Sequence, residues 1–456
     1  MAGPDATCLF DPTWTALRGQ AFGLAQPAII GGADVRLPES YDFQALDEAM
    51  YEHAGEPVPA FPADAGSAYA LLFRVLHWTG AVQRRHKIPV ASRFHLERAD
   101  TRATPAGGTE RFVLAMPYVA QEAASASINW VRSCVLSFLA RGGLAADGAQ
   151  LSQQREALRR RLAPFVEPGI NTFRFLRAAD GAEIPVTPIA PGLHAFGVGR
   201  RSRWLYSSLL DTTSAIGAMI ARDKFTSASI LRDAGLPAPT HFRVASQDQA
   251  VDAAHRLGYP VVVKPADRDQ GVGVAAGLTD DAGVGAAFAA AREFSNAILV
   301  EKHVEGNDYR IVVLDGAVVQ AFCRRPGGIV GDGRHSVAEL IDIQLRDEGV
   351  RRRERDFGRR LLSLDEEALD ILRERGMAPG TVVPADQFVA LRRRANVSAG
   401  GLPIYFKPGD IHPDNAALAI HAAAALRIDL VGVDIIMANL ARSWLETGAL
   451  ICEVNA

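Results

Sequence analysis

The chain has 456 residues, of which 48% are hydrophobic and 22% are charged, so its length predicts two or three domains rather than one. The formal net charge of -3 argues against nucleic acid or an anionic membrane as a partner. No signal peptide is predicted, because the first residues lack a basic segment followed by an apolar core. The four cysteines are scattered without CxxC pairs or metal-ligand spacing, which is typical of a cytoplasmic protein: Cys8, Cys134, Cys323 and Cys452.

The first 75 residues show few periodic runs, but clear elements are predicted after them. Apolar residues at helical spacing predict helices over 68–82 and 121–141, and the run RFVLAMPYV predicts a strand that begins at 111. A charged amphipathic helix is predicted over 151–165. Its three consecutive arginines are interpreted as a solvated helix face rather than an anion site.

After about residue 215 the pattern changes to short Val- and Ile-rich runs that alternate with Ala-rich stretches, which is typical of an α+β domain. The dipeptide Asp315-Gly316 predicts a hairpin turn. Residues 342–395 are highly charged and are predicted to form a helical insertion. Strands are predicted over 261–265, 297–304, 310–313, 317–322, 431–437 and 450–455, and helices over 223–234, 249–257 and 413–426.

Two lysines and a glycine loop are candidates for holding nucleotide phosphates. Lys224 opens a predicted helix, and Lys264 ends an apolar strand directly before a proline, which points its charge away from the core. Gly271 and Gly273 follow in a polar loop, where backbone N–H groups can approach phosphate oxygens. Each signal alone is more often a solvated lysine or a plain turn. Their order along the chain favours a nucleotide site.

An acidic residue and a short loop are candidates for binding adenosine. Glu301 ends the strand AILVE and could accept the adenine amino group, while the backbone as far as Val304 pairs with the ring edge. Asp308 follows seven residues later and could accept hydrogen bonds from the ribose hydroxyls. The alternative is an edge-strand carboxylate in solvent. It is less favoured here because this strand follows the lysine and glycine-loop signals.

Three oxygen-bearing side chains near the end of the chain are candidates for holding a metal. Asp434 interrupts an apolar strand, and Glu453 and Asn455 alternate on the last strand and therefore share one face. A carboxylate inside an apolar strand is costly unless it is paired or metal-bound. Hard oxygen ligands of this kind suit Mg²⁺, so we favour a metal site over a purely structural carboxylate.

Three further residues are candidates for positioning the reacting groups. Arg310 and Arg324 lie on the two hairpin strands and could face the same cleft, where arginine is suited to holding a carboxylate or an acyl phosphate. Asn396 begins a second glycine loop, ANVSAGG. We therefore expect the two arginines to hold a carboxylate or an acyl phosphate.

Taken together, these residues resemble the pattern of the ATP-grasp superfamily, with the ATP-grasp region of cyanophycin synthetases most similar and bifunctional glutathione synthetases next. The segments that carry the resemblance cover most of 218–456: ARDKFTSASILRDAGLPAP, GYPVVVKPADRDQGVGV, ILVEKHVEGNDYRIVVLDGAVV, GDGRHSVAELI, LRRRANVSAGG and VGVDIIMANLARSW…ICEVNA. Cyanophycin synthetases continue into a Mur-ligase-like domain with the motif G-x-x-x-x-G-K-[ST], which does not occur in this sequence.

The resemblance implies a fold and a set of roles. The fold is α+β, with an ATP-grasp domain over 218–456 whose two subdomains clasp ATP, a connecting segment over 161–217, and an N-terminal α/β domain over 1–160. The implied roles are phosphate binding by Lys224, Lys264 and the glycine loop of Gly271 and Gly273, adenine binding by Glu301 and Val304, ribose binding by Asp308, metal binding by Asp434, Glu453 and Asn455, and substrate positioning by Arg310, Arg324 and Asn396.

The implied activity is an ATP-dependent carboxylate–amine ligase that forms an amide or peptide bond through an acyl phosphate. ATP and Mg²⁺ are the expected cofactors, with two metal ions and with Mn²⁺ as a substitute. Amino acids or peptides are the expected substrates, and a homo-oligomer, either a dimer or a tetramer, is expected. Two alternatives stay open: a ligase for a carboxylate that is not an amino acid, and a catalytically silent ATP-binding partner subunit.

Overall fold

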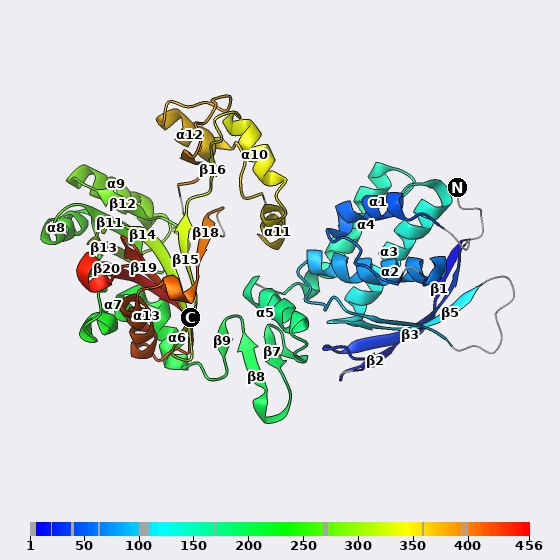
Figure 1. The fold of residues 1–456 in the computed structure, drawn as a ribbon. Helices are drawn as coiled ribbons and strands as arrows, with labels where there is room; N and C mark the ends of the chain where they lie inside the picture. Colours follow the sequence, from blue (N-terminus) through cyan, green and yellow to red (C-terminus); the bar gives the residue numbers. More distant parts are fainter. Residues whose placement is uncertain are drawn as a thin grey trace. The chain divides into compact units, whose positions relative to one another are not determined.

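A computed structural model describes residues 6–19, 21–37, 41–62, 64–99, 109–167, 170–267, 272–357, 360–393, 395, 397 and 400–456. The chain divides into two compact units, Met1–Ser208 and Leu209–Ala456 (Figure 1). Within the described ranges, no helix combines the length and the apolar character that a membrane span requires.

The first unit is built on an antiparallel sheet with the strand order β1-β3-β5-β4, and β2 pairs with the start of β3. Its main elements are β1 (Thr7–Phe10), β2 (Thr15–Leu17), β3 (Ala28–Arg36), α1 (Gln44–Ala54), α2 (Gly66–Arg85), β4 (His95–Arg98), β5 (Glu110–Pro117), α3 (Gln121–Arg141) and α4 (Gly148–Leu162). These bounds confirm the helices and the strand predicted in this half. The N-terminal domain was expected to be α/β, but its strands are joined by antiparallel pairings, so its arrangement is α+β.

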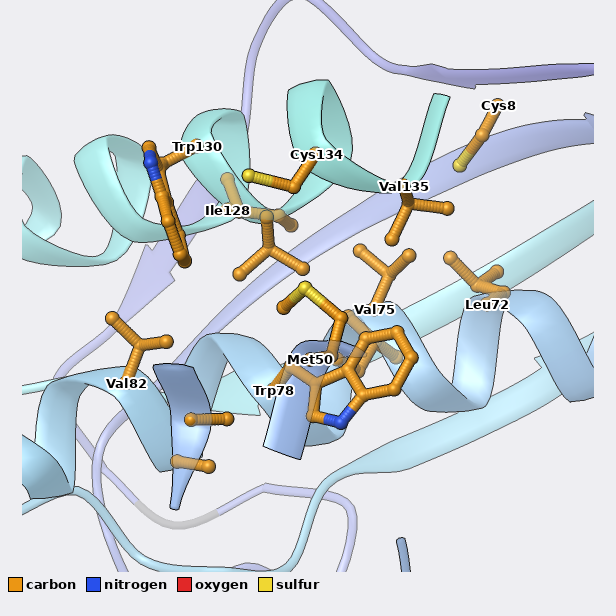
Figure 2. Close-up of a cluster of buried hydrophobic side chains, with 14 of the residues drawn as sticks. Cys8, Met50, Leu72, Val75, Trp78, Val82, Ile128, Trp130, Cys134 and Val135 are labelled. Carbon is orange, nitrogen blue, oxygen red and sulfur yellow. The ribbon is translucent and has the colours of Figure 1, made fainter. Parts of the chain in front are cut away.

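Helices α1, α2 and α3 supply most of the core of this unit. Figure 2 shows Met50 of α1 lying among side chains from α2 and α3, and Trp78 of α2 is fully buried with it. The sequence showed no periodic pattern for β3, because two glycines interrupt it. A Cβ atom at Gly31 would lie 2.9 Å from the ring of Trp14, and one at Gly32 would lie 2.3 Å from the guanidinium of Arg111. Close packing against the rigid ring therefore favours glycine at position 31, whereas a side chain at position 32 would displace the end of the Arg111 side chain.

The first unit ends in a short helical segment and a small sheet. The elements are η1 (Ala163–Phe165), α5 (Ile170–Gly181), β6 (Val186–Ala190), β7 (Leu193–Phe196), η2 (Gly199–Arg201) and β8 (Arg203–Tyr206). Strands β6, β7 and β8 form antiparallel pairs in sequence order. The segment between the two halves of the sequence is therefore folded into helix and sheet.

The second unit opens with β9 (Leu209–Leu210) and includes a four-stranded sheet and a five-stranded sheet, called the smaller and the larger sheet below; the smaller has the order β10-β13-β11-β12. Its elements are β10 (His241–Val244), α8 (Gln247–Leu257), β11 (Val261–Pro265), β12 (Ala275–Leu278), α9 (Asp281–Arg292) and β13 (Ile298–Lys302). Helices α8 and α9 cover one face, where alanines from both helices pack on valines of β11 and β13. The predicted strand over 297–304 is shorter than expected. The His303 N–H still donates to its register partner Pro260 O, but Pro260 has no N–H to return a bond, and the strand ends at Lys302.

The larger sheet of the second unit has the order β18-β15-β14-β19-β20. Its strands are β14 (Asn307–Leu314), β15 (Ala317–Arg325), β18 (Leu402–Phe406), β19 (Leu430–Met437) and β20 (Ala449–Asn455). Its helices are α6 (Ala215–Arg222), α7 (Lys224–Asp233), η4 (Pro408–Asp410), α13 (Pro413–Ala425) and α14 (Trp444–Thr447). The hairpin about Asp315-Gly316 is confirmed, and α13 packs on the apolar face of β14, β15 and β19. Helices and sheets together confirm the α+β class.

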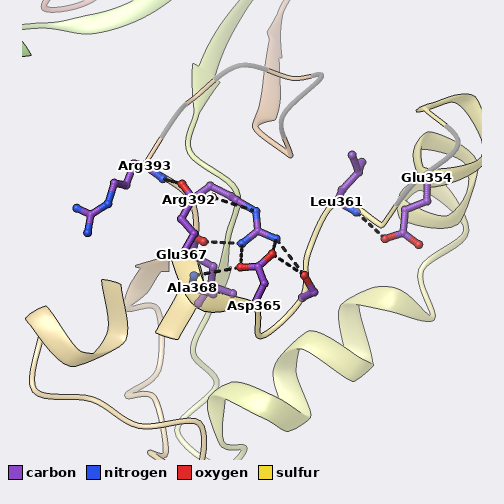
Figure 3. A network of polar contacts seen from close by, with 9 residues as sticks. Glu354, Leu361, Asp365, Glu367, Ala368, Arg392 and Arg393 are labelled. Carbon is purple, nitrogen blue, oxygen red and sulfur yellow. Dashed lines mark hydrogen bonds and ion pairs between the residues drawn. The ribbon is translucent and has the colours of Figure 1, made fainter. Parts of the chain in front are cut away.

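Between β15 and β18 lies the charged region that was expected to be helical. It contains β16 (Gly328–Val330), α10 (Val337–Leu345), α11 (Glu348–Phe357), α12 (Glu366–Glu374) and β17 (Phe388–Ala390), so its helices are accompanied by an antiparallel strand pair. Arg392, directly after β17, is buried and donates from both Nη atoms to Asp365 at 2.9 Å (Figure 3). The neighbouring Arg393 N–H donates to Glu367. These bonds tie the chain after β17 to the start of α12.

Candidate functional site

The larger sheet separates apolar from polar side chains because successive residues of a strand point to opposite faces. On β14, Tyr309, Ile311 and Val313 belong to the buried core under α13, which leaves Asp308 and Arg310 on the other face. The same alternation applies on β15 and β19, where core residues alternate with residues of the other face that include Arg324 and Asp434. The face away from α13 is therefore the one that gathers the charged candidates of this sheet.

A β-bulge in the last strand brings two of the metal candidates to this face. Asp434 pairs with Glu453, but the next residue of β19 pairs with Ile451, so Cys452 is the extra residue on β20. Ile451 and Val454 both lie in the core although they are three positions apart. Without the bulge, Glu453 would share the core-facing side of Ile451. The bulge therefore places Glu453 and Asn455 opposite the core.

Asp434 is the centre of an ion-pair network on this face. Arg310 donates to it from Nε at 2.6 Å and from Nη2 at 2.7 Å, which is a bidentate pair. Arg324 Nη2 lies 3.0 Å from Asp434 Oδ2 and 2.6 Å from Asp308 Oδ1, so it bridges two carboxylates. Asn455 Nδ2 also donates to Asp434 at 3.2 Å. The structure thus brings together five residues that the sequence predicted to belong to one site.

The network changes the acidity of its members. Burial raises the pKa of Asp308, and the nearby charge of Asp434 adds to this effect, although the ion pair with Arg324 opposes it. Burial alone would lower the pKa of Arg324, but the charge of Asp434 and the hydrogen bond to Asp308 outweigh burial and raise it. Arg324 consequently keeps its positive charge between the two carboxylates.

The side chains of Asp434, Glu453 and Asn455 supply the oxygen donors that Mg²⁺ prefers. Within the described part of the chain, no group of three or more His, Cys, Asp or Glu side chains could hold a metal ion by itself, so Asn455 would have to complete the set. Both oxygens of Asp434 accept hydrogen bonds from arginine. Oδ2 of Asp434 already has contacts with Arg310, Arg324 and Asn455, whereas Oδ1 accepts only from Arg310 Nε and therefore keeps a lone pair for a cation. The residues therefore fit a divalent cation.

The polar face of the smaller sheet carries a second, more deeply buried set of charges. Lys264 Nζ donates to Glu301 Oε1 at 2.7 Å, and His241 Nε2 lies 2.5 Å from Glu301 Oε2. All three residues are buried. Burial alone would raise the pKa of Glu301, but the charge of Lys264 and the contact with His241 outweigh it, so this pKa is lowered. Glu301 is therefore an ionised carboxylate with a partner on each oxygen.

The polar residues of the two sheets lie close to the same segment of β20. Burial raises the pKa of the Cys452 thiol, and the charges that also act on it come from Lys264 and Glu301 of the smaller sheet and from Asp308 and Asp434 of the larger one. The residue next to Cys452 is the metal candidate Glu453. Charged candidates from both sheets thus act electrostatically on the same segment of β20.

Lys224 reaches the same position from α7. It is the first residue of this helix, and the side chain of Asp223 caps the helix by accepting from the N–H groups of Phe225 and Thr226. Lys224 Nζ lies 3.8 Å from Glu453 Oε1, and its side chain is mostly buried. The N-terminus of a helix carries a partial positive charge, which adds to the charge of the lysine. An anion such as a phosphate would therefore bind favourably at this position.

The remaining candidates lie in loops. Gly273 has a φ of +70°, and a Cβ atom there would lie 3.0 Å from Pro265 and Phe294, so this position requires glycine. Val304 lies in the turn between β13 and β14. Gly271 and Asn396 lie outside the described residues, so their predicted roles stay predictions. The sequence reasoning missed His241, because its partner Glu301 is 60 residues away and no local pattern connects them.

Known proteins are similar to this chain in sequence. Residues 230–336 match the family model described as D-ala D-ala ligase C-terminus. The chain is 30% identical over 292 residues to a cyanophycin synthetase of Synechocystis sp., which covers 63% of this chain and 33% of that protein. It is also 31% identical over 236 residues to the glutathione biosynthesis bifunctional protein GshAB of Mannheimia succiniciproducens, covering 50% of this chain and 30% of that protein.

These matches confirm the resemblance to the ATP-grasp region of cyanophycin synthetases that the sequence segments carry. The chain spans about a third of the length of the curated relatives that it matches. Among solved structures, it is similar to a bifunctional glutathione synthetase from Pasteurella multocida with a TM-score of 0.49 and 24% identity, over 73% of this chain and 48% of that one.

Proposed function

We propose that the second unit is an ATP-dependent ligase that joins a carboxylate to an amine through an acyl phosphate. The observation that carries this proposal is the arrangement around Glu453. Two lysines suited to phosphates and two oxygen donors belong to four different elements of one unit: Lys224, Lys264, Asp434 and Glu453. Lys224 lies 3.8 Å from Glu453, Asp434 pairs with Glu453 in the sheet, and the charge of Lys264 acts on the adjacent Cys452. Similarity to cyanophycin synthetases and to GshAB supports the same activity.

The proposed reaction has two steps. An oxygen of the substrate carboxylate attacks the γ-phosphorus of ATP, the bond to the bridging oxygen breaks, and ADP leaves. The nitrogen of the amine then attacks the acyl carbon, the C–N bond forms, the C–O bond to phosphate breaks, and a proton leaves the nitrogen. The protein supplies no nucleophile, so its contribution is positioning and neutralisation of charge.

Each predicted residue has a place in this scheme. Lys224, Lys264 and the loop of Gly271 and Gly273 would hold phosphates, Glu301 and Val304 would contact adenine, and Asp308 would accept the ribose hydroxyls. Arg310, Arg324 and Asn396 would hold the carboxylate and the acyl phosphate. Asp434, Glu453 and Asn455 would hold Mg²⁺, two ions with Mn²⁺ as a substitute, which would neutralise charge on the nucleotide phosphates.

The substrates that we propose are amino acids or peptides, since the names of the relatives concern products built from amino acids. Arg310 and Arg324 already pair with Asp434 and Asp308, but each guanidinium keeps N–H donors beyond these bonds that suit a substrate carboxylate. We further propose that the protein works as a homo-oligomer in the cytoplasm. Its four free cysteines suit a reducing compartment.

The experiment that tests the proposal is a screen of amino-acid pairs and dipeptides for ADP release, with the product masses measured in the active mixtures. We expect ADP release that depends on both a carboxylate and an amine, and a product whose mass equals their sum minus water. Activity with other carboxylates alone would point to a different acid substrate. Absence of ADP release above background with every mixture would refute the ligase and leave a nucleotide-binding subunit.

A further inference from the structure

His241 is a buried side chain whose polar contact is directed at one carboxylate. It is the first residue of β10 and lies directly opposite Glu301 in the antiparallel register of β10 and β13. Its side chain is 1% exposed, and its Nε2 lies 2.5 Å from Glu301 Oε2. Because β13 runs between β10 and β11, Glu301 is held between His241 on one side and Lys264 on the other.

The second ring nitrogen of His241 makes no hydrogen bond to another described residue. This nitrogen, Nδ1, is buried. An ionised carboxylate only accepts hydrogen bonds, so Nε2 carries the proton and donates it to Glu301. Burying an imidazole with one nitrogen unsatisfied is costly, whereas an apolar side chain would fill the same space without that cost. The contact with Glu301 is therefore the reason for a histidine here.

We propose that His241 is a positioning residue for ATP, which acts through Glu301 on Lys264. By occupying Oε2, the imidazole leaves one oxygen of Glu301 for the Lys264 ammonium. An ammonium has three donors, so a single bond to Glu301 leaves two for phosphate oxygens. This inference rests on the proposed function, because it assigns the partner of a lysine that is proposed to bind ATP.

The expected effect of losing His241 follows from the geometry. Without the imidazole, Oε2 of Glu301 lies buried without a donor, and the carboxylate can rotate so that both oxygens face Lys264. The ammonium would then be drawn towards Glu301 and would offer fewer donors to a phosphate. Nucleotide affinity would fall even though neither His241 nor Glu301 needs to touch the phosphate chain.

The test measures binding of the non-hydrolysable analogue AMPPNP with Mg²⁺ by isothermal titration calorimetry on the full chain. His241→Leu is expected to weaken the affinity about tenfold or more, since hydrogen bonds to charged groups are the strong ones. His241→Gln is expected to restore most of it, because its amide nitrogen can reach the place of Nε2. His241→Asn, which is equally polar but too short, should behave like His241→Leu. The matched control is His255→Leu, a change at an exposed histidine of α8.

A double variant separates positioning from general damage to the fold. In Lys264→Met, the further change His241→Leu should have little additional effect on affinity, because the residue through which His241 acts is gone. Equal binding by wild type and His241→Leu, or an undiminished effect in the Lys264→Met background, would overturn the inference. The Gln and Asn variants decide the question if the Leu variant fails to fold. A wild-type protein that does not bind AMPPNP would instead refute the proposed function.

Discussion

The smaller and the larger sheet of the second unit each have one face that packs in a core and one face that carries charged side chains. The two sheets differ in how far these charged side chains are exposed to solvent. In the smaller sheet, the side chains of His241, Lys264 and Glu301 are 1%, 10% and 9% exposed. His241 and Lys264 both contact the Glu301 carboxylate. In the larger sheet, Asp434 is equally buried, but the Arg310 and Asp308 side chains are 29% and 36% exposed. Charges that water cannot reach must keep their partners, whereas half-exposed ones can be rehydrated. Substitutions in the smaller sheet should therefore affect folding first, and substitutions in the larger sheet should affect activity first.

The largest effect on stability is expected from Lys264→Met. It leaves the Glu301 carboxylate buried without its cation, and breaking a buried pair in this way costs roughly 3–5 kcal/mol in the free energy of unfolding. Urea unfolding at pH 7 measures the loss. Arg256→Met, which removes an exposed cation from α8, is the control and should change the stability little. A loss no larger than that of the control would contradict the comparison of the two sheets.

The same variant makes a pH prediction through Glu301. In the wild type the pKa of Glu301 is lowered in the folded state, so its contribution to stability is present above the unfolded value of about 4.3 and is lost as the pH falls through the folded value. In Lys264→Met, burial is no longer opposed by the lysine, and the pKa rises. The stability deficit of the variant should therefore be greatest near pH 7 and shrink as the pH falls towards 5. A deficit of the same size at both pH values would exclude this account.

Glu453→Gln is expected to remove activity while the fold persists. Glu453 is only partly buried and lies on the polar face of the larger sheet, so a neutral side chain of the same size can stay in place. The loss of a charged donor to a metal and of the contact with Lys224 should lower ADP release at least about a hundredfold, or roughly 2.7 kcal/mol. Glu446→Gln, an exposed change on α14, serves as the control. Turnover close to that of the wild type would show that Glu453 holds no metal.

A smaller loss of stability than that of Lys264→Met is expected from Arg324→Met. This change removes the cation that bridges Asp308 and Asp434, but Asp434 keeps its bidentate pair with Arg310, and Asp308 can be hydrated. We expect a loss of roughly 1–3 kcal/mol in the free energy of unfolding, below that of Lys264→Met. Arg325→Met changes the exposed neighbour on the same strand and provides the baseline. A loss that exceeds that of Lys264→Met would reverse the ranking of the two faces.

Local sequence signals predicted much of the second unit. Helix α7 begins directly after a capping aspartate and is followed by Gly235, and the hairpin turns at Asp315-Gly316. Both features could be predicted because caps and turns depend on residues only a few positions apart. Fewer elements of the N-terminal half could be predicted from the sequence. Strand β3 contains two glycines that serve close contacts with Trp14 and Arg111, and such contacts leave no periodic pattern in the sequence.

The sequence by itself determined which residue types could bind a nucleotide and a metal, their order along the chain, and the strands that carry them. Only the tertiary structure decided what those residues face. The bulge at Cys452 turns Glu453 away from the core, and the register of β10 and β13 puts His241 against Glu301. Residue type and alternation are local properties, whereas a pair of buried charges depends on strands that are far apart in the chain and are brought together by packing of the whole sheet.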